Sequence, residues 1–428
     1  MREKLPILLV SATLLAAAAG MPITAQQPSE SVPTFTKDVA PILYKHCVSC
    51  HRPGEAAPMS LLTYEQARPY ARAIANAVAN RTMPPWHADA PPGTFHNERI
   101  LSDVERQRVS AWLAGGALHG DANDLPSSPA FVEGWSLGKP DVVLEMQEEY
   151  NIPARGTVEY EYLYIPANFA EPKWVTSIEI RPGNRKAVHH VLVYYIAKPD
   201  VPRAPLTRAK SNTSPDQTTN GQKLSTRRSL TDGVQRRLLA TYAPGTNPQA
   251  VPNGTAFRLD PGGTLELQMH YTTVGEPVKD RTQIGFVFSK DPAPREVLPT
   301  HFFDGTFTLP AGAADMAVTT HVEFLQDATV WGLFPHTHLR GKKWDYKLQL
   351  PSGETKSILA VPRYDFNWQT YYMFTEPLQV PKGSKIVSTA WYDNSAANKN
   401  NPDPKVNVKW GDQTWEEMQY TGILVSPN

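Results

Sequence analysis

From about residue 140 onward, the chain repeats one pattern: short segments with apolar side chains at alternate positions, separated by Gly, Pro, Asn and Asp. A period of two is typical of β-strands, because successive side chains point to opposite faces of a sheet. No long stretch of helical period interrupts the segments, so they predict an all-β region of sandwich type. The clearest segments are TVEYEYLYIP, WVTSIEIRP, HHVLVYYI, TLELQMHYTT, TQIGFVFS, ATVWGLFPHTH, WDYKLQL and SKIVSTAWYDN.

The length of this region predicts more than one β-domain. About 290 residues is long for a single sandwich. We therefore expect two tandem β-sandwich domains of jelly-roll-like type, at residues 140–292 and 293–428, with the break at KDPAPREVLP. Within the first, Lys198–Arg237 is polar, basic and almost free of large apolar residues. This segment predicts an exposed insertion, and the sequence assigns it no function.

The part of the chain before the β region has a helical period. In EQARPYARAIANAVANR, one helical stripe holds Ala67, Tyr70, Ala71, Ile74, Ala77 and Val78. A second helix is predicted to begin after Ser102, where Glu105 completes a capping box, and to end at Gly115-Gly116. These features predict a small all-α unit at residues 34–118, joined to the β region by a linker at residues 119–139.

The first 25 residues have the pattern of a cleavable secretory signal. A basic start (Arg2, Lys4) precedes an apolar run from Leu5 to Ala19 and a small-residue site ending at Ala25. The alternative is a permanent N-terminal anchor, but the run is short for one. We expect an exported protein, periplasmic or secreted, without a stable membrane anchor. The equal numbers of acidic and basic residues, 42 each, argue against a nucleic-acid partner.

The helical unit carries the segment HCVSCH, which holds the only two cysteines of the chain. C-x-x-C-H in an exported protein is the attachment pattern of covalent haem c, with Cys47 and Cys50 forming thioethers and His51 binding the iron. A thioredoxin-like pair would need a βαβ context, and a zinc site would need further cysteines. The unit resembles class I cytochrome c domains over residues 34–118.

The second axial ligand of the haem iron is expected to be a downstream methionine or histidine. Met83, in RTMPPW, has the position that the resemblance assigns to the methionine ligand. Met59 is an alternative, but it follows the haem-binding segment closely and is typical of a core residue. His87 is a further alternative.

The histidines of the β region gather in three settings. His336 and His338 are two apart on a predicted strand, so both can reach one ion from the same face. In TLELQMHYTT, His270 shares a polar face with Glu266 and Gln268. His189 and His190 are adjacent, so joint ligation requires a strand end or a β-bulge. His301 and His321 are interpreted as ordinary surface or core histidines.

Four segments occur in a characteristic order: VHHVLVYY, YAPGTNPQAVPNGTAFRL leading into LQMHY, HTHLRG, and GDQTWEEMQYTG. Over residues 140–425 the chain resembles the copper type II, ascorbate-dependent monooxygenases, which include peptidylglycine α-hydroxylating monooxygenase and dopamine β-monooxygenase. The resemblance implies two tandem β-sandwich domains with one copper ion each. It implies an electron-transferring copper at His189, His190 and His270, and a catalytic, dioxygen-binding copper at His336, His338 and Met418. Gln268 corresponds to a glutamine between the two sites.

The donor types agree with this ligand set, because a thioether is a soft, neutral donor that suits Cu(I). Without the order of the motifs, Met418 would be interpreted as a core methionine beside Trp415. Two positions depart from the peptide hydroxylase. In that enzyme an arginine and a tyrosine hold the substrate's carboxylate; in this chain Phe334 stands in place of the arginine and Gly422 in place of the tyrosine. The resemblance therefore favours an apolar or aromatic substrate over a glycine-extended peptide.

Together these features predict a copper-dependent monooxygenase with one haem c and two copper ions, acting on a small-molecule substrate and O2. An external donor, either an ascorbate-like reductant or another cytochrome, would supply electrons that the haem relays. The alternatives are a copper- and haem-binding electron carrier, or a copper oxidase without hydroxylase activity.

Overall fold

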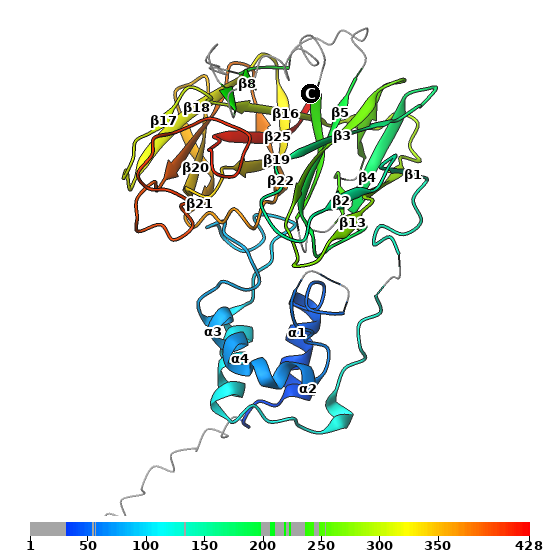
Figure 1. Ribbon diagram of the computed structural model, residues 1–428, viewed down its shortest axis with the longest axis vertical. Helices are drawn as coiled ribbons and strands as arrows, with labels where there is room; N and C mark the ends of the chain where they lie inside the picture. The colour runs from blue at the N-terminus through cyan, green and yellow to red at the C-terminus, as the bar shows by residue number, and fades with distance from the viewer. Residues whose placement is uncertain are drawn as a thin grey trace, which may run out of the picture. The chain divides into compact units, whose positions relative to one another are not determined.

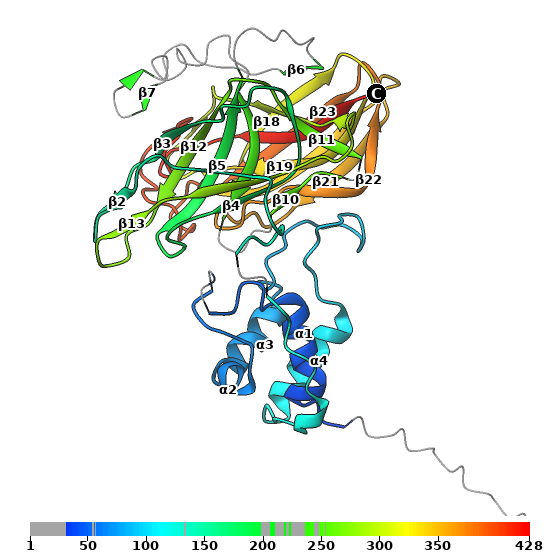
Figure 2. The same ribbon diagram turned by 90° about the vertical axis from the view of Figure 1, so that its right-hand side faces the viewer.

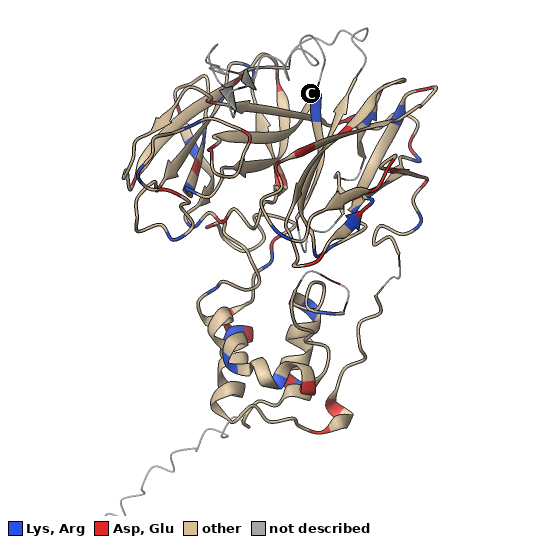
Figure 3. Cartoon of the chain, in the orientation of Figure 1, with Lys and Arg blue, Asp and Glu red and all other residues tan. Residues whose placement is uncertain are grey.

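β-Strands in several sheets make up most of the structure, and a few short helices precede them (Figure 1). The computed structural model describes residues 31–428 except 54, 56, 132–133, 198–205, 210–217, 220–221, 224–235, 244–247 and 253. The predicted signal at residues 1–25 lies outside the described residues. Among those described, no helix is long and apolar enough to cross a bilayer. Basic and acidic positions are interspersed along the described helices and strands (Figure 3).

The helices lie between residues 35 and 124 and share one apolar cluster, in which Phe35 and Trp112 are fully buried. The predicted capping box at α4 is present: Glu105 N donates to Ser102 Oγ at 3.2 Å, and Ser102 N donates to Glu105 Oε2 at 2.7 Å. The elements are η1 (Phe35–Val39), α1 (Ala40–His46), α2 (Tyr64–Ala67), η2 (Arg68–Tyr70), α3 (Ala71–Ala79), α4 (Asp103–Ala114) and η3 (Ala122–Asp124).

The predicted stripe on α2–α3 is only partly buried. Ala67, Ala71, Ile74 and Val78 belong to the apolar cluster, whereas Tyr70 is 42% exposed. The 3-10 turn Arg68–Tyr70 explains the difference. It contains a proline, which has no N–H to donate, and its tighter winding shifts the period at Tyr70.

Strands from residues 142 to 296 form two sheets that enclose one apolar cluster, as in a sandwich. Leu265, Leu267 and Met269 of β12 are fully buried in it, as their alternation predicted. The first sheet contains β1 (Val142–Glu145), β14 (Gln283–Phe288), β4 (Lys173–Arg181), β11 (Thr255–Leu259), β15 (Arg295–Glu296) and β10 (Gln249–Ala250); the second contains β3 (Glu161–Pro166), β12 (Thr264–Tyr271), β5 (Val188–Ile196) and β9 (Arg236–Tyr242); β2 (Tyr150–Ile152) pairs with β13 (Val278–Asp280).

Strands from residue 298 onward form a second pair of sheets around another apolar cluster. In Figure 1 these strands, mostly yellow to red, lie beside the green strands of the first pair, and in Figure 2 the two groups overlap along the view. One sheet contains β16 (Leu298–Phe303), β25 (Tyr420–Pro427), β19 (Ala328–His336) and β22 (Tyr372–Val380); the other contains β21 (Thr355–Val361), β20 (Gly341–Gln349), β23 (Lys385–Tyr392), β18 (Met316–Phe324) and β6 (Thr207–Ala209); β17 (Thr308–Leu309) pairs with β24 (Val408–Lys409), and β7 (Thr218–Thr219) pairs with β8 (Gln222–Lys223).

Parts of the predicted insertion at residues 198–237 belong to these sheets. β6 pairs with β18, and Leu206 is buried in the second cluster. At the other end of the segment, Arg236 and Arg237 begin β9, and Arg237 is buried. The expectation of an exposed insertion is therefore wrong at both places, because backbone pairing does not require the large apolar side chains that the segment lacks.

The loop between α3 and α4 packs against the second pair of sheets. Phe95 is buried in that apolar cluster and pairs with Phe374 of β22. His96 N donates to Met373 O at 3.0 Å, and Asn97 Nδ2 donates to Tyr371 O at 2.7 Å. We name residues 86–99 the arm. It ties the loop after Met83 to β22 and to the residue just before it.

Candidate functional site

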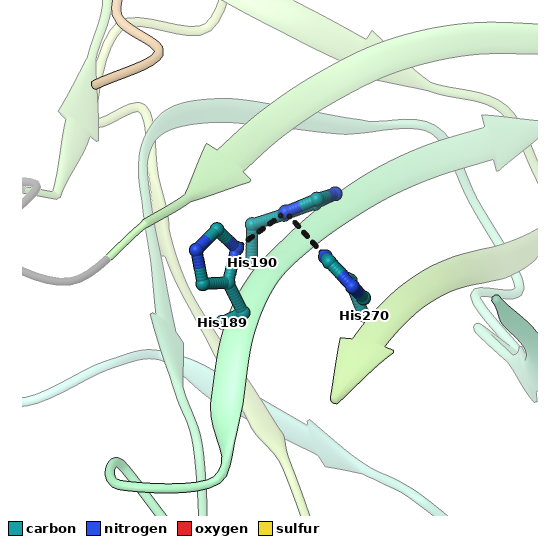
Figure 4. Close-up of side chains that lie close together, drawn as sticks. All are labelled: His189, His190 and His270. Carbon is teal, nitrogen blue, oxygen red and sulfur yellow. Dashed lines mark hydrogen bonds between the residues drawn. The ribbon is translucent and has the colours of Figure 1, made fainter. Parts of the chain in front are cut away.

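His189, His190 and His270 come together at one end of the sheet formed by β5 and β12 (Figure 4). His190 pairs with His270, and the next pair is Tyr271 with Val188, so His189 is an extra residue on β5. This is the β-bulge that adjacent histidines need if both are to face one point. The strand pairing itself thus sets the relative positions of the three imidazoles.

The three imidazoles present the same ring nitrogen to one another. His190 Nδ1 lies 3.1 Å from His189 Nδ1 and 3.3 Å from His270 Nδ1. One potential ligand atom from each residue lies within 4.8 Å of those of the other two. Such a convergence of nitrogen donors is the arrangement that a bound copper or zinc ion requires.

Tyr160 fixes the ring of His190 from the opposite side. Its hydroxyl lies 3.0 Å from His190 Nε2, and its ring stacks on His270 with centroids 4.8 Å apart. If Nε2–H donates to this hydroxyl, the lone pair of His190 is on Nδ1, facing the other histidines. Burial lowers the pKa of His270 to about 4 and that of His190 well below its usual value, with a further lowering from the neighbouring histidines. The imidazoles are therefore neutral, which is the form that binds metal.

His336 is the last residue of strand β19 and His338 lies two residues beyond it; both are buried, at 6% and 1% exposure. Their ring centroids are 5.2 Å apart, as expected for two side chains on one face. His336 pairs with Tyr420 in antiparallel register. The pairing ends there, and His338 and Met418 each lie two residues outside the paired strands.

The carboxylate of Glu417 joins the two segments that carry these residues. It is fully buried and accepts backbone N–H groups from His338 at 2.7 Å, Arg340 at 2.6 Å and Met418 at 3.1 Å. Burial raises the pKa of Glu417 to about 7, although these three donors favour the charged form. Sequence patterns did not indicate this residue, whose one signal was its place beside Met418.

Two further acceptors orient the imidazoles of this pair. Gln369 Oε1 lies 2.9 Å from His336 Nδ1, and the carbonyl of Glu416 lies 3.1 Å from His338 Nδ1. Both acceptors assign the proton to Nδ1, which leaves Nε2 of each ring as the donor to a metal. Burial lowers the pKa of His336 to about 4 and that of His338 well below its usual value, so both rings are neutral.

One aromatic ring contacts both histidine groups. Phe366 is buried, and its centroid lies 5.9 Å from that of His190 and 5.8 Å from that of His338. A second link runs through Gln268, whose Nε2 donates to Tyr162 Oη at 2.7 Å; Tyr162 then donates to Asp412 Oδ2 at 3.2 Å. The predicted glutamine is thus bonded toward the loop before Met418, and Phe366 was not anticipated.

The CVSCH segment follows α1. Burial raises the pKa of Cys47 to about 12, with a smaller effect from Cys50, and the two cysteines do not form a disulfide. His51 Nδ1 lies 3.3 Å from the carbonyl of Met59. If this nitrogen donates, His51 Nε2 remains available to bind iron, which fits the expected haem attachment.

The three candidates for the other axial ligand have different surroundings. Met59 packs partly buried against the helical cluster, whereas Met83 is 45% exposed. His87 lies on the arm, with both ring nitrogens buried and without a hydrogen-bond partner in the described part of the chain. The choice of Met83 as the second axial ligand stays a prediction. Of the remaining β-region histidines, His301 stacks on Tyr420, with ring centroids 5.3 Å apart.

No protein-family model and no curated protein matches this chain. Among solved structures it is similar to the VP2 subviral particle of infectious bursal disease virus, at 11% identity over 68% of this chain and 73% of that chain, with a TM-score of 0.19. It is also similar to allantoicase, at 8% identity over 57% of this chain and 81% of that chain, with a TM-score of 0.17. Likenesses this low carry no argument about the fold or function.

Proposed function

We propose that the chain is an exported, copper-dependent monooxygenase related to the copper type II, ascorbate-dependent enzymes, with a cytochrome c-like haem unit and two jelly-roll-like copper domains. The reaction consumes one O2, two electrons and two protons. One oxygen atom enters a C–H bond of the substrate, and the other leaves as water. The observation that supports this most is the convergence of three neutral imidazoles at His189, His190 and His270.

The two groups of ligands fit copper in different roles. Three imidazoles without a thioether suit an ion that only passes electrons, whereas two imidazoles and the thioether of Met418 suit a Cu(I) ion with an open position. Copper bound at these residues would supply one-electron chemistry and a position for dioxygen. The chain keeps the imidazoles neutral by burial and directs their lone pairs through Tyr160, Gln369 and the Glu416 carbonyl.

The surroundings of His336 favour a substrate with an apolar or aromatic reacting end. Phe334 is fully buried, and its ring lies nearly parallel to that of His336, with centroids 6.1 Å apart. A Cβ atom at Gly422 would lie 3.0 Å from Tyr371 Oη and 3.2 Å from Phe334 Cβ. The side chains packed beside His336 are therefore aromatic rings and one hydroxyl, with no cation at position 334 or 422 to hold a carboxylate.

The haem unit would supply electrons to this site. Cys47, Cys50 and His51 would hold haem c, with Met83 as the expected second axial ligand. An ascorbate-like reductant or another cytochrome would reduce it. Cleavage of the linker at residues 119–139 is expected to slow turnover severalfold, whereas unchanged turnover would contradict the relay.

Labelled oxygen provides the test of the reaction. Copper-loaded, reduced protein is incubated under 18O2 with a panel of small aromatic compounds, in parallel with His336→Ala and Met418→Ala. We expect a hydroxylated product with one labelled atom, absent from both variants. Hydrogen peroxide without a labelled product would favour a copper oxidase. Haem reduction without oxygen uptake would favour an electron carrier.

A further inference from the structure

A cavity of about 300 Å³ lies between the arm, the loop before β22, and β9 with β10. Its walls include Trp86, Arg99, Gln249, Trp368, Gln369 and Tyr371. The volume is at the lower end of the roughly 300–1,000 Å³ that small-molecule sites occupy. Gln369 also lies beside the second histidine group, with its Oε1 2.9 Å from His336 Nδ1.

The lining carries two polar groups whose hydrogen-bonding capacity is unused. Trp368 Nε1 and Gln249 Nε2 are each buried without a hydrogen-bond partner among the described residues. A buried donor without a partner costs about 1–3 kcal/mol, so two of them at one cavity indicate that a ligand satisfies them.

The charge of the lining determines the kind of ligand. Of the described residues that line the cavity, none is acidic, and Arg99 carries the one permanent charge. Its guanidinium lies over the ring of Trp368, 5.2 Å from the centroid. A cation among N–H donors favours an anionic ligand with several hydrogen-bond acceptors. The flat faces of Trp86 and Trp368 favour a ligand with a planar ring.

We propose that this cavity binds a small planar organic anion, such as an aromatic carboxylate or an enediolate. The carboxylate or enediolate oxygens accept from Arg99, Gln249 and Trp368, and the ring packs against the indoles. Because Gln369 both lines the cavity and faces His336 Nδ1, an occupant also affects the orientation of His336. Only this last consequence rests on the proposed function.

The test is a calorimetric titration of the purified full-length protein with sodium benzoate, and with benzamide as the neutral analogue. We expect one benzoate per chain, bound at least about tenfold more tightly than benzamide. Arg99→Gln should weaken benzoate about tenfold and leave benzamide unchanged. Trp368→Phe keeps the aromatic face but removes the N–H, and should weaken both ligands severalfold.

Arg181→Gln is the matched control, because the Arg181 guanidinium also lies 5.2 Å from a tryptophan centroid, that of Trp135, and Arg181 is not part of the cavity lining. It should bind benzoate like the unaltered protein. Equal benzoate affinity in Arg99→Gln and the unaltered protein would overturn the proposal, as would no binding at millimolar benzoate. The proposal would also be overturned if Arg181→Gln weakened benzoate binding as much as Arg99→Gln does.

Competition with ascorbate distinguishes whether the natural anion is the reductant or a carboxylate substrate or product. Displacement of benzoate assigns the cavity to the reductant, and retention of benzoate assigns it to a carboxylate substrate or product. Each titration is repeated after copper removal. If the protein binds benzoate but never holds copper, the anion-binding proposal stands and the monooxygenase proposal fails. The failure of one proposal is therefore distinguishable from the failure of the other.

Discussion

The two histidine groups are built by different means. His189, His190 and His270 come from neighbouring strands of one sheet, and a single bulge brings them together. His336, His338 and Met418 come from segments far apart in the sequence, joined by the buried carboxylate of Glu417. The hydrogen bonds also differ, since the first group directs Nδ1 atoms inward and the second leaves Nε2 atoms available. A site set by strand pairing depends on the backbone, whereas a site set by one carboxylate depends on that side chain.

The largest expected effect is that of Glu417→Ala. It leaves the N–H groups of His338, Arg340 and Met418 without their acceptor in a buried place. We expect the free energy of unfolding to fall by about 3–5 kcal/mol and copper to be lost from the second group alone. Urea unfolding and copper analysis measure the two effects.

Glu416→Gln is the control for that variant, because the backbone carbonyl that faces His338 is unchanged. It should retain copper at both groups. If Glu417→Ala instead loses copper from His189, His190 and His270 as well, the two sites are not independently built and the comparison fails.

Two smaller effects concern metal affinity, and each should be confined to one of the two histidine groups. Tyr160→Phe removes the hydroxyl beside His190 Nε2 but keeps the ring that stacks on His270. Gln369→Leu removes the acceptor beside His336 Nδ1. Loss of such a partner weakens metal binding by roughly 10–100-fold, and each variant should weaken only its own group. Competition titrations with a Cu(I) chelator measure this, and equal weakening of both groups by either variant would contradict it.

The smallest effect concerns His301, a partly buried histidine that belongs to neither group and serves as a reference. Burial lowers its pKa to about 4, so the folded state holds it neutral while the unfolded state takes up a proton below about pH 6.5. Its contribution to the unfolding free energy is therefore present above pH 6.5 and falls as the pH drops toward 4.

His301→Phe keeps the aromatic contact with Tyr420 and cannot titrate. Between pH 7 and pH 5, the unaltered protein should lose about 1–2 kcal/mol more unfolding free energy than this variant. Urea unfolding of copper-free protein at the two pH values measures the difference. An identical loss in both proteins would show that the ring has its ordinary pKa.

Local patterns predicted the parts that depend on neighbouring residues. The alternation in TLELQMHYTT gave the buried face of β12. The adjacency of His189 and His190 required a strand end or a bulge, and the paired strands β5 and β12 contain a bulge there. The i, i+2 spacing of His336 and His338 predicted that the two rings lie close together, and they do, although His338 lies just past the end of β19. Each of these features depends on residues that are close in the sequence or in one strand pair.

The parts that depend on distant residues could not be predicted. Nothing local to Glu417 indicates that it accepts N–H groups from a segment nearly 80 residues earlier. Nor does the proline-rich loop after Met83 show that Phe95 packs in the cluster of the second pair of sheets. Phe366 stands between two sites that the sequence separates widely. Contacts between residues far apart in the sequence leave no periodic pattern in it, so only the tertiary structure reveals them.

The most direct test of the account is the ratio of copper to haem in the purified protein, compared with Met418→Ala and His270→Ala. Met269→Leu, a buried core change beside His270, is the control and should behave like the unaltered protein. We predict two copper ions per haem, with each of the two ligand variants retaining one. No copper after supplementation, or zinc in its place, would contradict the account, as would the loss of both ions from either ligand variant.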